Sequence, residues 1–442
     1  MRHRVVLLVS AVWFLGLGPA ARAQFLSFDA RRTGMAGVSL GRDGSLTRFN
    51  PAYSAVPARA GRSAKVTIPI PLGLFQVLKD STAFDFDSSY FNPIALVNYI
   101  LHPPLFLEVK KAPTPTNDVE FTIGRDSLIV DLGSAAQLVP TDRFGFGGMS
   151  RLADIGVTVK GVHVGVLLWE EHDVGFQLGD TLLRFLRQKD PARTNTTYSS
   201  AGDAIAQAGF APTLGYAGRV WGDSLRGLYL GASVHYYLGV TYASVAGMAG
   251  FTTGDTLFGG SNPVSPAVDA LVSYSKPGRS LGRGFGTDVG FVYVSGPVEV
   301  GFGVNDIGAT LTWSDTRVER DTFDTASNGF GSSLVGDHLK TKTKLPISYV
   351  ANAALDLGTN TTAGVMVLNN GRGTSVQLGV EQRVGPLALR GGVARDQRKR
   401  VQVGWGTGLR FGAFGLDVGF ATHSGSLSSA RGITMGTSIS IY

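Results

Sequence analysis

The 442-residue sequence contains no cysteine, which excludes a disulfide framework and a lipid anchor attached to cysteine. It is also poor in charge, with charged residues making up only 17% of the chain. The net charge of +7 includes positive charges close to the N-terminus. The remaining excess forms no basic stripe with interleaved aromatic residues, so nucleic acid is not expected as a partner. Beyond residue 23, no apolar run is long enough for a membrane helix.

The first 23 residues have the pattern of a secretory signal peptide. A basic start, with Arg2 and Arg4, precedes an apolar stretch from Val5 to Leu17, and Ala21-Arg22-Ala23 forms an A-x-A cleavage signature. A single membrane helix is the alternative, but the apolar run is short for that. The pattern predicts an exported protein whose mature chain begins at Gln24.

Glycine is abundant, at 60 of 442 residues, about twice the usual share of roughly 7%. Many segments of about ten residues alternate between apolar and polar or glycine residues, as in 400–411 (RVQVGWGTGLRF) and 413–422 (AFGLDVGFAT). A soluble sandwich with its apolar face turned inward is the alternative. The length and number of the segments, together with the export signal, favour a transmembrane antiparallel β-barrel in the bacterial outer membrane.

Short and long connections alternate along the chain, as in barrels with short periplasmic turns and longer outer loops. They predict about fourteen strands: 65–71, 152–160, 162–170, 211–221, 226–240, 286–295, 297–307, 347–357, 361–369, 374–384, 386–394, 400–411, 413–422 and 432–442. The long outer loops expected between them include 72–151, 171–210, 241–285 and 308–346. The first of these is too long for a plain loop, and Phe121 to Asp131 could form a further strand. Leu271 to Ser275 could also pair.

The polar faces of these strands enclose charges that need partners or water. The lumen-facing polar residues are predicted to be Asp356, Glu381, Arg383, Arg390, Arg400, Arg410 and Asp417. A segment rich in small residues, with Gly34, Met35 and Gly37 at one end and Asn50-Pro51 at the other, precedes the first strand. Inside a wide barrel it would find partners for its backbone, and the Asn-Pro pair would turn the chain into the wall. A mobile N-terminal tail is the alternative.

The stretch RRTGMAGVSLGRDGSLTRFNPAYSAV (31–56) resembles the N-terminal hatch of the FadL-type outer-membrane transporters and their PorV/PorQ-like relatives. Tyr53 departs from the glycine that the transporters often carry there. The resemblance implies a luminal hatch over 24–60, acting as a gate, and a fourteen-stranded barrel over 61–442. It implies either passage or binding of hydrophobic small molecules, or a non-transporting role as an accessory of protein secretion or of the cell envelope, with a secreted protein as partner.

Catalytic chemistry is not expected, because the histidines lack metal-ligand spacing and the glycine-rich runs lack a strand–loop–helix context. No cofactor or metal is predicted. The long outer loop 171–210 carries an apolar stretch, Leu182, Leu183, Phe185 and Leu186. It is interpreted either as a short amphipathic helix over the barrel mouth or as a capture site for an apolar ligand.

Overall fold

The computed structural model describes residues 29–42, 46–57, 66–70, 104–107, 118–123, 126–131, 144–187, 190–255, 264–276, 280–324, 329–395, 401–422 and 431–441. The signal peptide predicted over 1–23 lies outside the described residues, as does Arg400. None of the described helices is long and apolar enough to cross a membrane.

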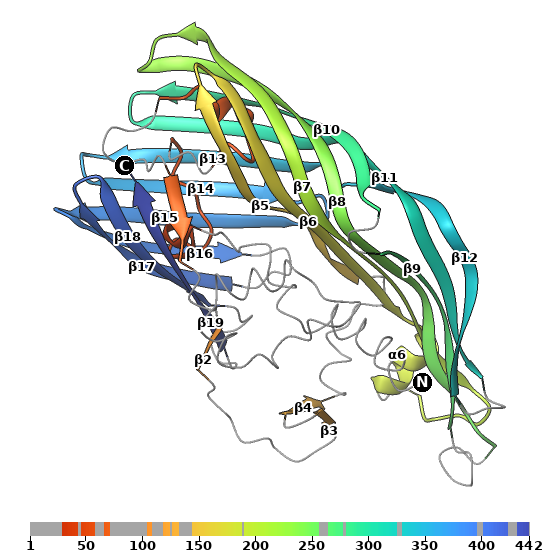
Figure 1. The fold of residues 1–442 in the computed structure, drawn as a ribbon. Helices are drawn as coiled ribbons and strands as arrows, with labels where there is room; N and C mark the ends of the chain where they lie inside the picture. Colours follow the sequence, from red (N-terminus) through yellow and green to blue (C-terminus); the bar gives the residue numbers. More distant parts are fainter. Residues whose placement is uncertain are drawn as a thin grey trace.

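The described residues are mostly strands (Figure 1). Their helical elements are α2 (Ala30–Thr33), the 3-10 helix η2 (Pro51–Ser54) and α6 (Asp180–Leu186). The strands are β1 (Val66–Pro69), β2 (Pro104–Leu107), β3 (Asp118–Ile123), β4 (Asp126–Asp131), β5 (Phe144–Val159), β6 (Val162–Leu178), β7 (Thr197–Gly222), β8 (Arg226–Thr253), β9 (Val264–Ser275), β10 (Gly282–Ser295), β11 (Val298–Asp324), β12 (Gly329–Lys344), β13 (Ser348–Leu357), β14 (Thr361–Asn369), β15 (Thr374–Val384), β16 (Leu387–Arg395), β17 (Val401–Phe411), β18 (Phe414–Thr422) and β19 (Arg431–Ile441).

Seventeen of these strands form one antiparallel sheet, and β3 and β4 form a separate hairpin. The seventeen strands occupy fourteen positions in the sheet. β9 and β10 follow each other between β8 and β11, because both strands pair with both neighbours. β12 and β13 share one edge of β11 in the same way, and β1 and β2 share one edge of β19. The fold is an antiparallel β-barrel, and its fourteen positions confirm the predicted number.

The interruption between β12 and β13 has a local cause. Pro346 lies between the two strands and has no N–H to donate to a ladder. On the facing strand, β11 is irregular at the same level, where Asp306 and Gly308 have positive φ angles of 63° and 71°. At this level, the strand that pairs with this edge of β11 therefore changes from β13 to β12.

The alternation places large apolar side chains on the outward face of the sheet. These exposed residues form a band that we call the apolar belt: Val289, Phe291, Tyr293, Val298, Val300, Phe302, Leu355, Leu357, Val376, Leu378, Val380, Leu389, Val393, Trp405, Leu409, Phe414, Leu416 and Ile439. Their strand neighbours on the other face, such as Asp288, Glu381 and Asp417, are buried. This is the arrangement of a barrel whose outer surface meets lipid and whose lumen is polar.

Three predicted outer loops are wrong, because the strands continue through much of them. β7 has 26 residues, β8 has 28 and β11 has 27. We call residues 197–208, 241–253, 264–275, 310–324 and 329–344 the flange; it extends past the ends of β13 to β18 (Figure 1). Its strands carry polar residues on both faces, so the alternation that marks the belt fades there while backbone pairing continues.

The two ends of the sheet are β5 on one side and β1 with β2 on the other. Among the described residues, no backbone pairing joins β5 to β1 or β2. β5 instead contacts the turn after β14, where the Met149 N–H donates to the Asn370 carbonyl at 3.1 Å. Asn370 Nδ2 also donates to the Gly147 carbonyl at 2.9 Å.

The belt predicts a depth-dependent cost for charge on the outward face. Val289→Lys, near the middle of the belt, should lower the free energy of unfolding in lipid vesicles by roughly 2–4 kcal/mol. Val384→Lys, at the turn after β15, is the matched control and should cost at most about 1 kcal/mol. Denaturant unfolding followed by tryptophan fluorescence measures both, and equal costs would contradict a membrane belt.

Candidate functional site

The N-terminal segment, residues 29–42 and 46–57, lies against the inner face of the sheet, and its capping residues set its turns. Asp29 caps α2 by accepting a hydrogen bond from the Arg31 N–H at 2.9 Å. Asn50 caps η2 by accepting from the Ala52 N–H at 3.1 Å, with Pro51 at the first helical position. Asn50 Nδ2 also donates to the Phe291 carbonyl of β10 at 3.0 Å. The Asn-Pro pair therefore forms a cap that is also attached to the wall.

Inward-facing glycines allow the segment to approach the wall backbone. A Cβ atom built on Gly34 would lie 3.0 Å from Gly406 Cα, and one built on Gly392 would lie 2.3 Å from the Met35 carbonyl oxygen. One built on Gly379 would lie 3.1 Å from both Met35 Cβ and Val38 Cβ. The glycines on the polar faces of β15 to β17 thus leave space that the segment occupies.

The segment supplies one member of a buried charge cluster, which we call the Glu381 cluster. Arg31 makes a bidentate contact with Glu381, with Nε to Oε2 at 2.7 Å and Nη2 to Oε1 at 3.1 Å. Arg390 Nε donates to Glu381 Oε2 at 2.7 Å, and Arg383 Nε donates to Oε1 at 2.9 Å. Arg390 Nη1 lies 2.7 Å from Asp417 Oδ1. Three guanidinium groups and two carboxylates thus neutralise most of one another's charge.

A second contact joins the segment to β11. Tyr53 Oη donates to Glu299 Oε1 at 2.6 Å, and Arg42 Nε donates to Glu299 Oε2 at 3.0 Å. Phe49, Tyr53 and Val56 also belong to a buried apolar cluster. Their partners from the wall are Tyr229, Val292, Val294, Val350, Met366 and Leu368. The second half of the segment is therefore held by apolar burial as well as by charge.

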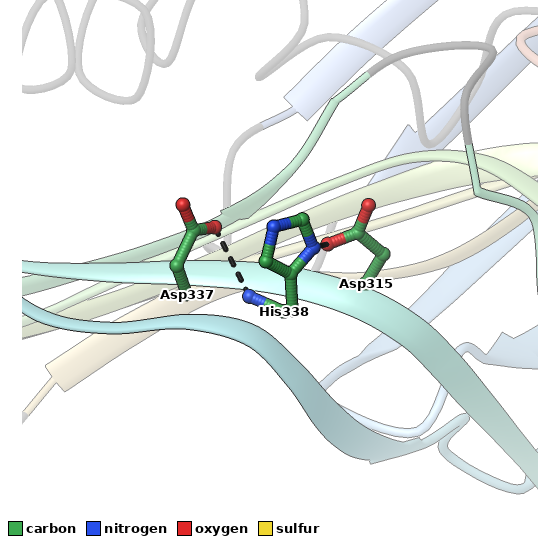
Figure 2. Close-up of side chains that lie close together, drawn as sticks. All are labelled: Asp315, Asp337 and His338. Atoms are coloured by element: carbon green, nitrogen blue, oxygen red, sulfur yellow. Dashed lines mark hydrogen bonds and ion pairs between the residues drawn. The ribbon is translucent and has the colours of Figure 1, made fainter.

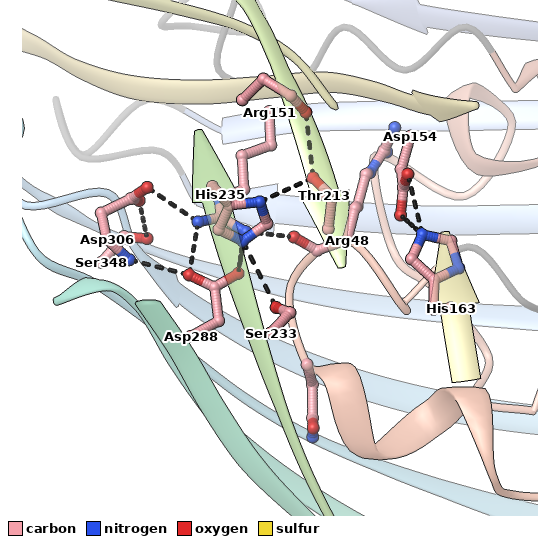
Figure 3. A network of polar contacts seen from close by, with 12 residues as sticks. Arg48, Arg151, Asp154, His163, Thr213, Ser233, His235, Asp288, Asp306 and Ser348 are labelled. Atoms are coloured by element: carbon pink, nitrogen blue, oxygen red, sulfur yellow. Dashed lines mark hydrogen bonds and ion pairs between the residues drawn. The ribbon is translucent and has the colours of Figure 1, made fainter. Parts of the chain in front are cut away.

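A third network, shown in Figure 3, centres on Asp288 of β10. Arg151 of β5 donates to both oxygens of Asp288, at 2.5 and 2.8 Å, and to Asp306 Oδ1 at 2.8 Å. Its Nη1 also donates to the Arg48 carbonyl of the segment at 2.8 Å. His235 Nε2 lies 2.6 Å from Asp288 Oδ2. A small cavity beside this network is lined by both the segment and the wall.

One line of contacts in this network has the order of a proton relay. Thr213 Oγ1 lies 2.7 Å from Nδ1 of His235. The other ring nitrogen of His235, Nε2, contacts Asp288. The Thr213 hydroxyl also donates to the Ala211 carbonyl at 3.0 Å. The hydroxyl thus has a backbone acceptor of its own. The residues position the segment and balance charge.

Of the predicted lumen residues, Glu381, Arg383, Arg390 and Asp417 meet in one cluster. Asp356 instead accepts a hydrogen bond from Thr362 at 2.8 Å, and Arg410 donates to the Gly412 carbonyl at 3.1 Å near the turn after β17. The predicted gate residues are placed in or beside the two helical elements of the segment, and all are buried: Gly34, Met35, Gly37, Asn50 and Pro51.

Sequence reasoning missed Arg31, Arg151 and Asp288 as site residues. Alternation could have placed Asp288 inward, since Val289 and Phe291 occupy the apolar face of that strand. Nothing in the local sequence marks Arg31 or Arg151, whose partners lie 350 and 137 residues away.

The predicted apolar loop residues lie in helix α6, between β6 and β7. Leu183 is buried, and the Phe185 ring lies 5.2 Å from the Tyr198 ring of β7, centroid to centroid. Leu182, Phe185 and Leu186 are half-buried. The helix therefore packs on the flange with part of its apolar surface still accessible.

The flange also carries Asp315, Asp337 and His338 close together (Figure 2). Consecutive residues Asp337 and His338 reach the same place because His338 has a positive φ of 53° within an irregular stretch of the ladder. Such a set could hold a divalent cation. Asp315 already contacts His338 Nδ1 at 3.0 Å, and Asp337 contacts Arg317 Nη1 at 3.5 Å, so the carboxylates have partners without a metal.

Comparisons with known proteins give only distant similarities. No family model and no curated protein sequence matches the chain. Among solved structures, the chain is similar to the Ralstonia pickettii toluene transporter TbuX, with 12% identity over 70% of this chain and 94% of that one and a TM-score of 0.32. It is also similar to the CymD monoaromatic hydrocarbon channel (13%, 71% and 91%, 0.33). A Pseudomonas aeruginosa FadL homologue has 10% identity over 68% and 88%, with a TM-score of 0.32. Because these TM-scores are low, the assignment of a β-barrel rests on the strand pairing of this chain alone.

Removing the central carboxylate should release the first half of the segment. Glu381→Gln leaves Arg31 and Arg390 without their shared counter-charge and should destabilise the protein by roughly 3–5 kcal/mol. Because Arg31 and Arg32 are buried in the folded protein, trypsin should cleave there faster in the variant. The measurement is the cleavage rate of the folded protein, read by mass spectrometry.

The matched control for this prediction is Glu319→Gln, which removes a half-exposed carboxylate paired with Arg317 in the flange. It should cost at most about 1 kcal/mol and leave cleavage at Arg31 and Arg32 unchanged. Unchanged cleavage in Glu381→Gln would show that this cluster does not hold the segment.

Proposed function

We propose that the mature chain is an outer-membrane barrel that admits or binds hydrophobic small molecules, with residues 24–60 as a luminal hatch. The observation that carries the proposal is the burial of the N-terminal segment against the inner face, through the Glu381 cluster, Glu299 and the Asp288 network. An occupied lumen blocks free passage, so a molecule that crosses has to displace part of the segment.

The contacts favour a segment that can move. Backbone lies on backbone at Gly34 and Gly406, where no side chains interlock. The Arg31–Glu381 contact can be replaced by water or by Arg383 and Arg390, which already touch the same carboxylate. We propose Gly34, Met35, Gly37, Asn50 and Pro51 as gate residues.

Helix α6 supports a capture site for the ligand. Leu182, Phe185 and Leu186 keep accessible apolar surface beside buried Leu183 in the connection between β6 and β7. A patch of this kind can bind an apolar molecule before it enters the lumen. Export through a cleaved signal peptide over residues 1–23 completes this proposal.

The alternative is a non-transporting, PorV-like barrel that acts as an accessory to secretion or to the envelope. The flange favours it, because strands of up to 28 residues extend beyond the belt and offer a surface to a protein partner. In that case the segment would stay in place and no small molecule would cross.

An engineered disulfide that holds the segment reversibly distinguishes the two proposals. It can be introduced cleanly because the chain has no cysteine of its own. Val38 Cβ lies 3.1 Å from a Cβ built on Gly379, close to the spacing of about 3.8 Å in disulfides. The oxidised V38C/G379C variant should take up a labelled long-chain fatty acid or toluene into liposomes at least about tenfold more slowly than after reduction, because the disulfide ties the segment to β15.

The two single-cysteine variants are the controls and should transport equally with and without reductant. Equal uptake by the oxidised and reduced double variant would contradict a moving hatch. Uptake by the wild-type protein no greater than by empty liposomes would contradict transport itself and favour the accessory role.

A further inference from the structure

Four basic side chains lie together on the outward face at the foot of the flange. The pairing register aligns Arg283 of β10 with Thr312 of β11 and Thr312 with Lys342 of β12. Thr310 pairs with Lys344 one row nearer the belt, and Lys340 follows Lys342 on the same face of β12. Arg283 and the three lysines are all exposed. We call these four residues the basic row.

The basic row begins where the apolar belt ends. Along β10 the outward positions are Tyr293, Phe291, Val289, Thr287 and Phe285, and Arg283 comes next. Ser295 and Phe285 lie ten positions apart on β10. At about 3.3 Å per residue and a tilt of about 40°, this stretch spans roughly 25 Å, the height of a lipid-facing band. Arg283 therefore lies at head-group level, on the side away from the short turns.

An aromatic pair marks the same boundary. The rings of Tyr236 and Phe285 lie 4.8 Å apart, centroid to centroid, on neighbouring strands directly below Arg283. Aromatic side chains collect at the interface between hydrocarbon and head groups. Their position supports the assignment of the basic row to the head-group layer and not to the hydrocarbon.

Within the part of the chain that the structure describes, the four cations have no counter-charge. Among the described residues, no carboxylate forms an ion pair with any of them. The acids that flank Lys340 are engaged elsewhere, Asp315 with His338 and Asp337 with Arg317. The lysines cannot turn inward, because the other face of these strands is filled by buried Trp313 and Thr343.

We propose that the basic row binds the phosphate groups of anionic lipid in the outer leaflet. Unpaired cations at the edge of hydrocarbon require an anion, and lipid phosphate lies at their level. The hydroxyl groups of Thr310 and Thr312 lie in the same rows and can add hydrogen bonds to phosphate oxygens. The inference rests on the membrane belt and is independent of transport.

The test uses the full-length mature protein in detergent, titrated with lipid A carrying both phosphates and followed by native mass spectrometry. K340Q/K342Q/K344Q should weaken binding at least about tenfold, because each cation contributes to attraction at the surface. Lipid A without phosphates should bind the wild-type protein as weakly as the variant binds the phosphorylated form.

The matched control, K160Q/R219Q/R226Q, removes three exposed cations at the short-turn end and should stay within about twofold of wild type. Mobility on gels with and without heating checks that both variants are folded. The proposal is overturned if the lysine variant binds as tightly as wild type, if phosphate-free lipid A binds equally well, or if millimolar inorganic phosphate abolishes the lysine-dependent binding, since the ligand would then be a free anion.

Discussion

Charges enclosed by the barrel have to be balanced by other charges, and this constraint determines how the interior is built. Because side chains alternate along each strand, every second residue of the wall faces inward, and Asp288, Glu381 and Asp417 are buried there. A buried carboxylate without a partner would be far more costly than an exposed one. Part of the compensation comes from the N-terminal segment through Arg31 and Arg42. The segment is therefore an electrostatic part of the wall and not only a filler of its lumen.

The fourteen wall positions could be predicted from the sequence because period-two alternation is a local signal wherever one face meets lipid. The same signal is absent from the flange, where apolar and polar residues occur on both faces of β8 and β11, so predicted loops proved to be strands. Pro346 illustrates a further limit. It divides β12 from β13, yet the two strands share one edge of β11, which only the pairing register reveals.

At the candidate site, the sequence predicted residues that the wall contributes to the Glu381 cluster, but not their partner in the N-terminal segment. Alternation placed Glu381, Arg390 and Asp417 in the lumen, where they do meet. It could not pair Glu381 with Arg31, since such a contact depends on the register of the whole barrel and on the path of a segment that has no repeat. Asp356 and Arg410 face the same side of their strands but lie nearer the turns, so they contact local partners instead.

The two halves of the segment are held to the wall by unequal contacts. Withdrawal of Arg31 would leave Glu381 and Asp417 facing Arg383 and Arg390, a cluster of two acids and two bases that is still balanced. Withdrawal of residues 46–57 would instead separate Glu299 from Tyr53 and expose the apolar cluster around Phe49 and Val292. Near α2 the buried apolar cluster is smaller and consists of Met35, Val38 and Leu40. The larger apolar cluster and the hydrogen bond from Asn50 to the Phe291 carbonyl therefore make the second half the more firmly attached of the two.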